Sequence, residues 1–343
     1  MKHESRLAQI GHGGNAPVPR RHAWNLQPPA GTAGARVLIA AGRLLLAPLV
    51  GMLLAHAGSA GAQEMEPRIY GNLPIGMNFL IAAYAHSTGG LAINPALPVK
   101  DAQLKVDTPA FGYVHAFEAW GKSARFEAVV PAGCLSGTAE ASGVLVSRDV
   151  CGLLDPSFRL ALNFYGAPAL TLKEFASYKQ DLVAGASLLV QPPLGQYDPS
   201  KLVNLGTNVW TIRPDIGISK AAGPMTFELG LAASLFTTNH DFFGGKTRQQ
   251  DPVYSTRANL IYTFHNKVWA SLNATYYIGG RSTVNGVEND DFISSKRVGL
   301  SLAFPVDRQQ SIKLHGSRGI SVRTGTDFDI LGIAWQYRWG AGL

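Results

Sequence analysis

Polar side chains recur at alternate positions in many segments of this sequence, between neighbours that are mostly apolar. On a strand, such spacing places the polar side chains together on one face. Twelve of them have charged, imidazole or amide groups suited to binding a charged or polar solute. These candidates for an inner lining are Arg159, Arg213, Asp215, Glu228, Arg257, Asn259, Asn273, Arg297, Lys313, His315, Gln336 and Arg338.

The charges of this set allow two interpretations. Six of the twelve side chains are formally positive and two are negative. They could form a basic constriction that favours anions such as aromatic carboxylates. They could instead form a structural network in which Arg213, Asp215 and Glu228 are paired. Because an unpaired arginine in a tight space is costly, we expect some pairing in either case.

His315 and Ser317 are two positions apart and would share one face of a strand, so they are the pair from which nucleophilic catalysis could be built. A histidine that activates a serine needs a third group to orient it, and no Asp or Glu occupies an evident orienting position. The face that carries His315 and Ser317 alternates with the apolar Ile312 and Leu314. If the apolar side chains face the lipid of a membrane, the pair points away from a lipid substrate. An outer-membrane acyl hydrolase is therefore a minor alternative, which an assay for fatty-acid release would test.

The two cysteines, Cys134 and Cys151, are 17 residues apart in a polar segment rich in Ser and Gly. In an exported protein this arrangement favours a disulfide over two free thiols. Closing a loop of that size contributes roughly 3 kcal/mol in the chain-entropy model. The segment offers too few ligands for a metal, and the histidines after Ala62 show no metal-ligand spacing, so we expect no metal and no cofactor.

The first 62 residues have the order of an export signal with an extended basic leading region. Residues 1–36 are basic and rich in Pro and Gly, and an apolar block runs from Leu44 to Ala55. This block is shorter than the ~20 residues of a transmembrane helix. Ala60-Gly61-Ala62 then forms a cleavage pattern of small residues. We expect cleavage near Ala62, followed by a short N-terminal periplasmic segment, 63–75, with room for a short peg at most.

Charge outside this leader is nearly balanced. The chain has a formal net charge of +7, but six of its 30 basic residues and one of its 23 acidic residues precede Gln63. The remainder carries 24 minus 22, or +2, which removes the compositional argument for binding nucleic acid. Charged residues are 15% of the chain, against about 25% in a soluble domain, and no long apolar run follows the leader. This composition suits a barrel with apolar residues at alternate positions.

The alternation is clearest in the last segment. Leu331 and Ile333 share a face with Trp335, Tyr337 and Trp339, while small and polar residues lie between them. The three aromatic side chains suit the headgroup level of a membrane and form a predicted aromatic belt.

The body, 76–339, predicts an all-β transmembrane up-and-down antiparallel β-barrel of about twelve strands, followed by the tail 340–343. An even number of strands with alternating short and long connections is typical of such barrels. One strand is ambiguous, because Phe111, Tyr113 and Phe117 fall on the face expected to point inward. The expected strands are 76–86, 103–117, 122–131, 152–164, 181–191, 208–219, 225–237, 254–264, 267–278, 296–304, 310–318 and 327–339.

The connections carry two further features. The long polar loops are 87–102, 132–151, 192–207, 238–253 and 279–295, and a shorter one is 319–326. Tyr197, Phe242, Phe243 and Phe292 in these loops either form an apolar entrance for solutes or pack the loops together. The connection 165–180 is long for a periplasmic turn. Its Thr171-Leu-Lys-Glu174 sequence fits a capping box, so we expect a short periplasmic helix from Leu172 to Lys179.

A family resemblance rests on six segments, which are Leu170–Tyr178, Pro193–Pro199, Leu202–Asn208, Asp241–Gly245, Ala274–Gly280 and Trp335–Trp339. They resemble the outer-membrane transporter family of the meta-cleavage pathway of phenol degradation. The resemblance implies a barrel that admits hydrophobic substrates, and it supplies no catalytic or ligand-binding residue. The extended N-terminus and the tail after Trp339 depart from the family pattern.

We therefore expect a bacterial outer-membrane barrel, not an enzyme, that passes small hydrophobic or aromatic molecules passively. Its expected partners are outer-membrane lipids, the barrel-assembly machinery and the solute, but no nucleic acid. About twelve strands lie between the eight that side chains fill and the sixteen that leave an aqueous channel, so side chains and loops would set the bore. The alternative is a structural or adhesive barrel with a plugged lumen.

Overall fold

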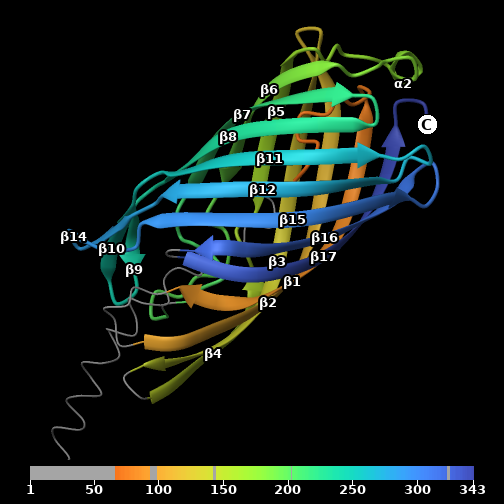
Figure 1. Cartoon of the computed structure of the whole chain (residues 1–343). Coiled ribbons are helices and arrows are strands. Elements are labelled where there is room, and N and C mark those ends of the chain that lie inside the picture. Colours follow the sequence, from red (N-terminus) through yellow and green to blue (C-terminus); the bar gives the residue numbers. More distant parts are fainter. Residues whose placement is uncertain (1–65, 93–98, 142–143, 202, 323–324) are drawn as a thin grey trace, which may run out of the picture. The chain divides into compact units, whose positions relative to one another are not determined.

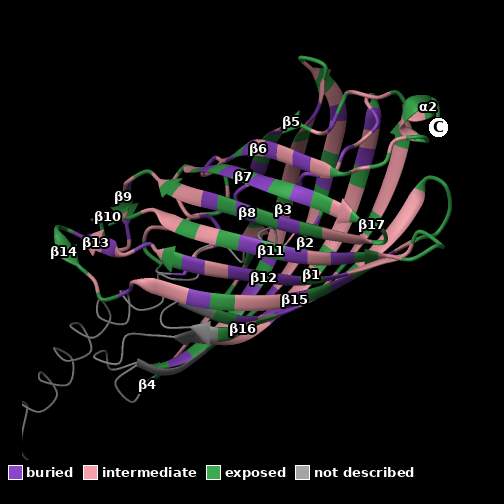
Figure 2. Ribbon diagram, turned by 45° about the horizontal axis from the view of Figure 1, so that its top comes forward, coloured by how far each residue is buried: buried purple, intermediate pink, exposed green. Residues whose placement is uncertain are grey.

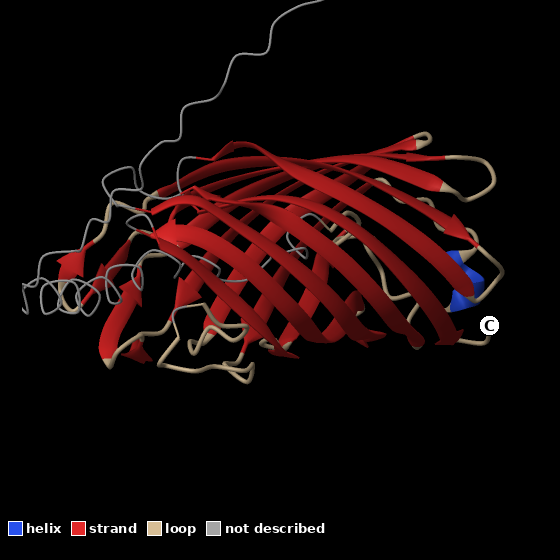
Figure 3. Ribbon diagram, turned by 90° about the horizontal axis from the view of Figure 1, so that it is seen from below, coloured by secondary structure: helices blue, strands red, loops and turns tan. Residues whose placement is uncertain are grey.

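The computed structural model describes residues 66–92, 99–141, 144–201, 203–322 and 325–343. The predicted signal peptide, 1–62, lies outside these residues. Strands dominate the described part of the chain, and they wrap around one barrel axis (Figure 1, Figure 3). No helix in the described part is long and apolar enough to cross a membrane.

Twelve antiparallel strands close the barrel. They belong to a thirteen-stranded sheet, whose remaining member, β4 (Val144–Leu153), pairs with β3 alone. The sheet closes because β1 pairs with both β17 and β2, and β2 pairs with β3. The twelve are β1 (Met77–Ala92), β2 (Val99–Ala119), β3 (Lys122–Ala141), β5 (Ser157–Tyr165), β6 (Leu182–Gln191), β7 (Thr211–Ala222), β8 (Met225–Phe236), β11 (Val253–Thr263), β12 (Trp269–Gly279), β15 (Ile293–Pro305), β16 (Gln310–Val322) and β17 (Gly325–Gly340).

The fold class is confirmed, and each of the twelve predicted ranges overlaps one strand of the closed barrel, although their bounds differ. The barrel has two ends. The short connections, the start of β1 and the end of β17 lie at one end, called the turn end, and the long connections lie at the other, called the loop end. Short turns are typical of the periplasmic side of an outer-membrane barrel. In Figure 1 the C-terminus and α2 (Leu172–Phe175) lie at the turn end, away from the labels of β9, β10 and β14.

Alternating burial shows which face of each strand points outward. On β7, Ile212, Ile216 and Ile218 are exposed, whereas Arg213 and Asp215 between them are buried. Figure 2 shows this alternation as purple and green bands along β7 and β8. An apolar outer face over a polar inner face is the pattern of a barrel that spans a membrane.

The expectation that Phe111, Tyr113 and Phe117 point inward is wrong. Phe111 is 66% exposed and pairs across the sheet with Ala82 on the outer face, and Tyr113 pairs with Leu80. Alternation could not decide this strand, because the opposite face of β2 is also apolar or small at Gly112 and the positions after it. The register between β2 and β1 determines which face of β2 points outward.

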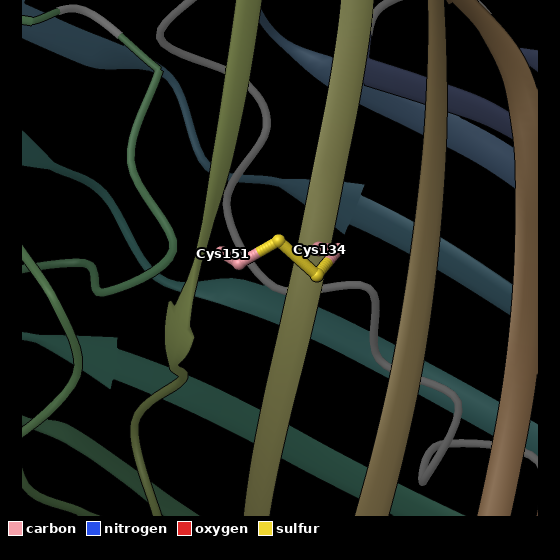
Figure 4. Close-up of a disulfide and its surroundings, with 2 residues drawn as sticks. All are labelled: Cys134 and Cys151. Atoms are coloured by element: carbon pink, nitrogen blue, oxygen red, sulfur yellow. A yellow bond between two sulfur atoms is a disulfide. The ribbon is translucent and has the colours of Figure 1, made fainter.

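The predicted loop 132–151 is instead a β-hairpin, formed by the end of β3 and by β4. The predicted strand 152–164 is correspondingly divided near Asp155 into β4 and β5. Cys134 and Cys151 lie directly opposite each other in this hairpin and form the predicted disulfide, with their Cα atoms 4.1 Å apart (Figure 4). Cross-strand pairing of Ser- and Gly-rich segments gives little alternation in sequence, so the pattern did not reveal these strands.

Two other predicted loops also contain strands. They form a small four-stranded sheet of β9 (Asn239–Phe242), β10 (Lys246–Gln250), β13 (Ser282–Val284) and β14 (Val287–Glu288). Strands of two to five residues are too short for a period of two to be recognised in the sequence.

The predicted helix begins as expected and ends early. Thr171 caps α2, and the Glu174 carboxylate accepts a hydrogen bond from the Thr171 backbone N–H, which completes the capping box. These hydrogen bonds from Thr171 lower the pKa of Glu174 below its usual range. The helix ends at Phe175, not at Lys179, because Ser177 donates both its backbone N–H and its hydroxyl to the Glu174 carbonyl.

The predicted aromatic belt lies on the outer face at the turn end of β17. The Trp335 and Tyr337 rings are 6.2 Å apart, and the Tyr337 and Trp339 rings are 5.8 Å apart. Tyr113 of β2 lies 6.3 Å from Trp339 and extends the belt. This position suits a membrane interface.

Candidate functional site

All twelve predicted lining residues lie on the inner face of the barrel, as their alternation with outward residues requires. Seven of them are buried, namely Arg159, Arg213, Asp215, Glu228, Arg257, Asn259 and Asn273. The other five, Arg297, Lys313, His315, Gln336 and Arg338, are half-buried. The structure therefore brings them around one lumen, and their partners determine what that lumen can do.

The segment before β1 enters this lumen. Its described residues, 66–75, are called the peg, and they lie against the inner wall near the turn end. The Arg68 backbone N–H donates to Glu228 at 2.8 Å, and its guanidinium donates to Thr263 at 2.8 Å. The Lys313 ammonium lies 2.6 Å from the Glu66 carboxylate. The segment 63–75, expected in the periplasm, therefore has Glu66 and Arg68 against the inner face of the barrel.

Tyr70 anchors the middle of the peg. Its side chain is 2% exposed, and its hydroxyl donates to Asp215. The ring lies over two glycines of the wall, because a Cβ at Gly185 or Gly217 would be 2.5 or 2.4 Å from it. Any residue with a Cβ at these two positions would clash with the Tyr70 ring. Gly185 and Gly217 therefore form the space, called the seat, that the ring occupies.

A third glycine allows a buried ion pair to form across a strand. Arg257 on β11 reaches over β8 to Asp215 on β7, with 3.2 Å between the guanidinium and the carboxylate. A Cβ at Gly230 on β8 would lie 2.6 Å from the Arg257 guanidinium. Asp215 therefore holds both the wall, through Arg257, and the peg, through Tyr70.

A second charged group lies on β3 and β5. Glu127 is 2.6 Å from Arg125 and 3.5 Å from Arg159. Arg125 also donates to the Arg68 carbonyl of the peg at 3.5 Å. Sequence analysis missed Arg125 and Glu127, although they alternate with outward residues of the predicted strand 122–131 and could have been found by that signal.

The charged side chains of the twelve predicted lining positions, of Arg125 and Glu127, and of the peg are together net basic. Eight cationic side chains are opposed by four carboxylates, which leaves an excess of four positive charges. The cations are Arg68, Arg125, Arg159, Arg213, Arg257, Arg297, Lys313 and Arg338, and the carboxylates are Glu66, Glu127, Asp215 and Glu228. Several cations are paired, as predicted, and the excess makes the lumen more favourable for anions than for cations.

The structure separates the pair proposed for a hydrolase. The His315 ring nitrogen Nδ1 lies 3.1 Å from the Ser301 hydroxyl, whereas Ser317 accepts a hydrogen bond from Arg297 at 3.1 Å. Ser301 is buried in the wall and also accepts a hydrogen bond from Asn273. No group of three or more potential metal ligands occurs among the described residues.

The loop aromatics are held separately. The Tyr197 hydroxyl donates to the Asp241 carbonyl and accepts a hydrogen bond from Asn239, both at 3.0 Å. Phe242 is buried, with the Arg248 guanidinium 5.9 Å from its ring centroid. In these two cases the contacts favour packing of the loops over an open apolar entrance. Phe243 is half-buried, and Phe292 lies 5.8 Å from Arg281.

Comparison with known proteins supports the barrel fold. A family model described as the putative MetA-pathway of phenol degradation matches residues 86–337. The COG4313 outer membrane channel from Pseudomonas putida F1 has a similar structure, with a TM-score of 0.70 and 19% identity over 80% of this chain and 100% of that one. The transport unit of the autotransporter AIDA-I from Escherichia coli has a TM-score of 0.48 and 10% identity, over 84% of this chain and 96% of that one. No curated protein matches the sequence.

Proposed function

We propose a function from one premise, that the chain belongs to the family described as the putative MetA-pathway of phenol degradation. The protein is a passive outer-membrane channel for small molecules, and its solutes are small hydrophobic or aromatic compounds. The similar Pseudomonas putida structure is described as an outer membrane channel, which supports the general function. The family description supports the aromatic solutes.

The observation that carries this proposal is a charged lumen that holds the peg against its inner wall. A barrel that serves only as a scaffold can fill its interior with apolar side chains. Here the inner face holds buried arginines and carboxylates, which are costly to desolvate. The peg is held near the turn end by a few polar contacts and the seat of Tyr70, so its withdrawal would widen a basic passage.

The lining also suits aromatic solutes. Arginine guanidinium groups bind carboxylates and lie favourably over aromatic rings. Benzoate-like anions combine both groups, and the excess of positive charge favours their entry over that of cations. The carboxylate of such a solute would offer a further partner to Arg159, Arg213 and Arg257 on the inner face.

Uptake by liposomes that contain the refolded protein tests the proposal. Entry of benzoate is compared with entry of a sugar of similar size, in bare liposomes, with wild-type protein and with Tyr70→Ala. We expect protein-dependent entry that favours benzoate and increases when the Tyr70 seat is vacated. A Tyr276→Ala variant is the matched control, because the Tyr276 hydroxyl forms its hydrogen bond with the Ser294 hydroxyl and not with the peg.

A structural or adhesive barrel is the second candidate, and one observation favours it. The peg lies against the inner wall near the turn end, and at the loop end a connection packs against the inner faces of three strands. If neither solute enters faster than in bare liposomes with wild-type protein or with Tyr70→Ala, the lumen is closed in function, and this second candidate replaces the channel.

A further inference from the structure

The inner face of the barrel changes from charged to apolar at the loop end. Six buried apolar side chains from three strands gather there, and they are called the outer apolar site. Leu104 and Val106 come from β2, Leu135 and Ala139 from β3, and Phe328 and Ile330 from β17. Each is at most 6% exposed. Strand register places them together, since Val106 pairs with Leu135 and Ile330 pairs with Ser87 beside Val106.

What covers this site is part of the same chain. The connection between β6 and β7 is called the inserted loop, and its described residues are 192–201 and 203–210. Val203 and Leu205 of this loop are 3% and 8% exposed, and they belong to the same apolar cluster. Loops normally run over the surface with polar side chains, so two buried aliphatic residues at this position require a specific seat.

The seat is closely packed. A Cβ at Gly133 would lie 3.7 Å from a methyl group of Leu205 and 2.6 Å from one of Leu154. The Arg148 guanidinium donates to the Val203 carbonyl at 3.3 Å. Two aliphatic side chains thus fill an apolar site of the barrel much as a small apolar solute would fill it.

One carboxylate binds the inserted loop on both sides of Val203 and Leu205. Asp155, between β4 and β5, is 3% exposed. One of its oxygens accepts the Gly195 backbone N–H at 2.7 Å. The other accepts the Thr207 backbone N–H at 2.8 Å and the Thr207 hydroxyl at 2.6 Å. Asp155 therefore fastens both sides of the loop, with Val203 and Leu205 between its two attachment points.

We propose that the outer apolar site binds the apolar or aromatic part of the solute, and that Val203 and Leu205 occupy it until the loop leaves. This inference rests on the proposed channel function and identifies where its selectivity arises. When the loop leaves, the six side chains become exposed to water. A solute with apolar surface reverses that exposure, whereas a sugar does not.

The geometry also sets an order of contacts along the passage. The Arg297 guanidinium donates to the backbone carbonyl of Phe328 at 2.9 Å, so a cation of the lumen wall adjoins the outer apolar site. A solute that enters from the loop end meets apolar side chains first. Its polar substituent then reaches Arg297 while its ring is still bound.

The test uses cells that produce the full-length protein in the outer membrane, with Tyr70→Ala in every variant so that the peg does not limit entry. Entry of the apolar probe N-phenylnaphthylamine is followed by its fluorescence, and entry of a polar chromogenic β-lactam by its hydrolysis in the periplasm. Asp155→Asn keeps the size of the side chain but presents an amide N–H where a carboxylate oxygen accepts hydrogen bonds. We expect it to raise entry of the apolar probe by roughly tenfold, since hydrogen bonds to a charged group are lost, and to raise entry of the β-lactam much less.

Two further variants separate the latch from the site. Val203→Ser with Leu205→Ser empties the site without changing Asp155, so it should give the same rise and serves if Asp155→Asn fails to fold. Ile330→Ser, added to Asp155→Asn, should remove the preference for the apolar probe. Asp198→Asn is the matched control, because Asp198 bonds to Ser200 within the loop, and entry should not change.

The outcomes distinguish this inference from the channel function. If Asp155→Asn raises entry of both probes equally, the loop is only a steric plug and the outer apolar site is not a binding site. If entry with Tyr70→Ala exceeds that of cells without the protein but neither loop variant changes it, the inference also fails. If no variant exceeds cells without the protein for either probe, the channel function itself is wrong.

Discussion

At the scale of single residues, glycines on the inner wall decide which side chains can meet. Gly230 leaves space for Arg257 to reach Asp215 across a strand, and Gly217 leaves space for the Tyr70 ring. These glycines have no unusual backbone conformation, so their role is to leave space for the neighbouring side chain. A methyl group at such a position must displace a side chain that holds the peg or the ion pair.

Gly217→Ala provides the corresponding prediction. Its Cβ would be 2.4 Å from the Tyr70 ring, so the ring must move and its hydrogen bond to Asp215 must weaken. We expect the free energy of unfolding to fall by about 1–3 kcal/mol and protein-dependent uptake of benzoate to rise. Urea unfolding in liposomes and the uptake assay measure the two effects.

Gly112→Ala is the control for this variant. Its Cβ would meet Ile81 at 3.5 Å, an ordinary contact away from the peg, so stability and uptake should stay near wild type. Unchanged uptake with Gly217→Ala would contradict the assignment of Tyr70 as the anchor of the peg.

At the scale of elements, the β3–β4 hairpin continues the wall beyond the point where β3 pairs with β5. Only β3 pairs with β4, so one edge of the hairpin has no strand beside it within the described sheet. The disulfide between Cys134 and Cys151 joins its two strands near the barrel. The hairpin also contributes Leu135 and Ala139 to the outer apolar site. The position of the hairpin therefore affects how Val203 and Leu205 of the inserted loop pack.

Replacing both cysteines by serine should loosen the hairpin and spare the barrel. The chain-entropy contribution of this loop is roughly 3 kcal/mol, and it acts on the hairpin alone. We expect trypsin to cleave at Arg148 faster in the variant, while the barrel keeps its heat-dependent gel mobility. Wild-type protein treated with a reductant should behave in the same way. Equal cleavage rates with and without the disulfide would show that strand pairing alone holds the hairpin.

At the scale of the whole barrel, the balance of lumen charge predicts ion selectivity. The twelve lining positions, Arg125, Glu127 and the peg together carry eight cations and four carboxylates, so an opened passage attracts anions. With Tyr70→Ala in planar bilayers under a salt gradient, the reversal potential should show preference for chloride over potassium. Adding Arg159→Gln removes one buried cation and should move that potential toward zero.

An outward charge gives the control for this measurement. Arg318 lies on the outer face and pairs with Asp329 at 2.5 Å, so Arg318→Gln should leave the reversal potential unchanged. A cation-selective passage would show that the excess arginines are neutralised or do not line the route.

The period of the sequence by itself determined the fold class, the approximate place of the twelve barrel strands and the inner position of all twelve lining residues. It also predicted the cysteine pair and the cap at Thr171. These features depend on residues that are neighbours in sequence, since alternate side chains of a strand point to opposite faces whatever surrounds them. Local patterns failed where both faces were alike, as at Phe111, or where strands were as short as β14.

Tertiary structure alone decided which charges meet and what fills the two ends of the barrel. Arg68 and Glu228 are 160 residues apart, and Tyr70 and Asp215 are 145 residues apart, so no local period relates them. The insertion of Val203 and Leu205 likewise depends on side chains from three other strands and on Asp155. Alternation predicts that a residue faces the lumen, but it does not predict which partner that residue meets. The partner comes from a distant part of the chain, and only closure of the barrel brings the two together.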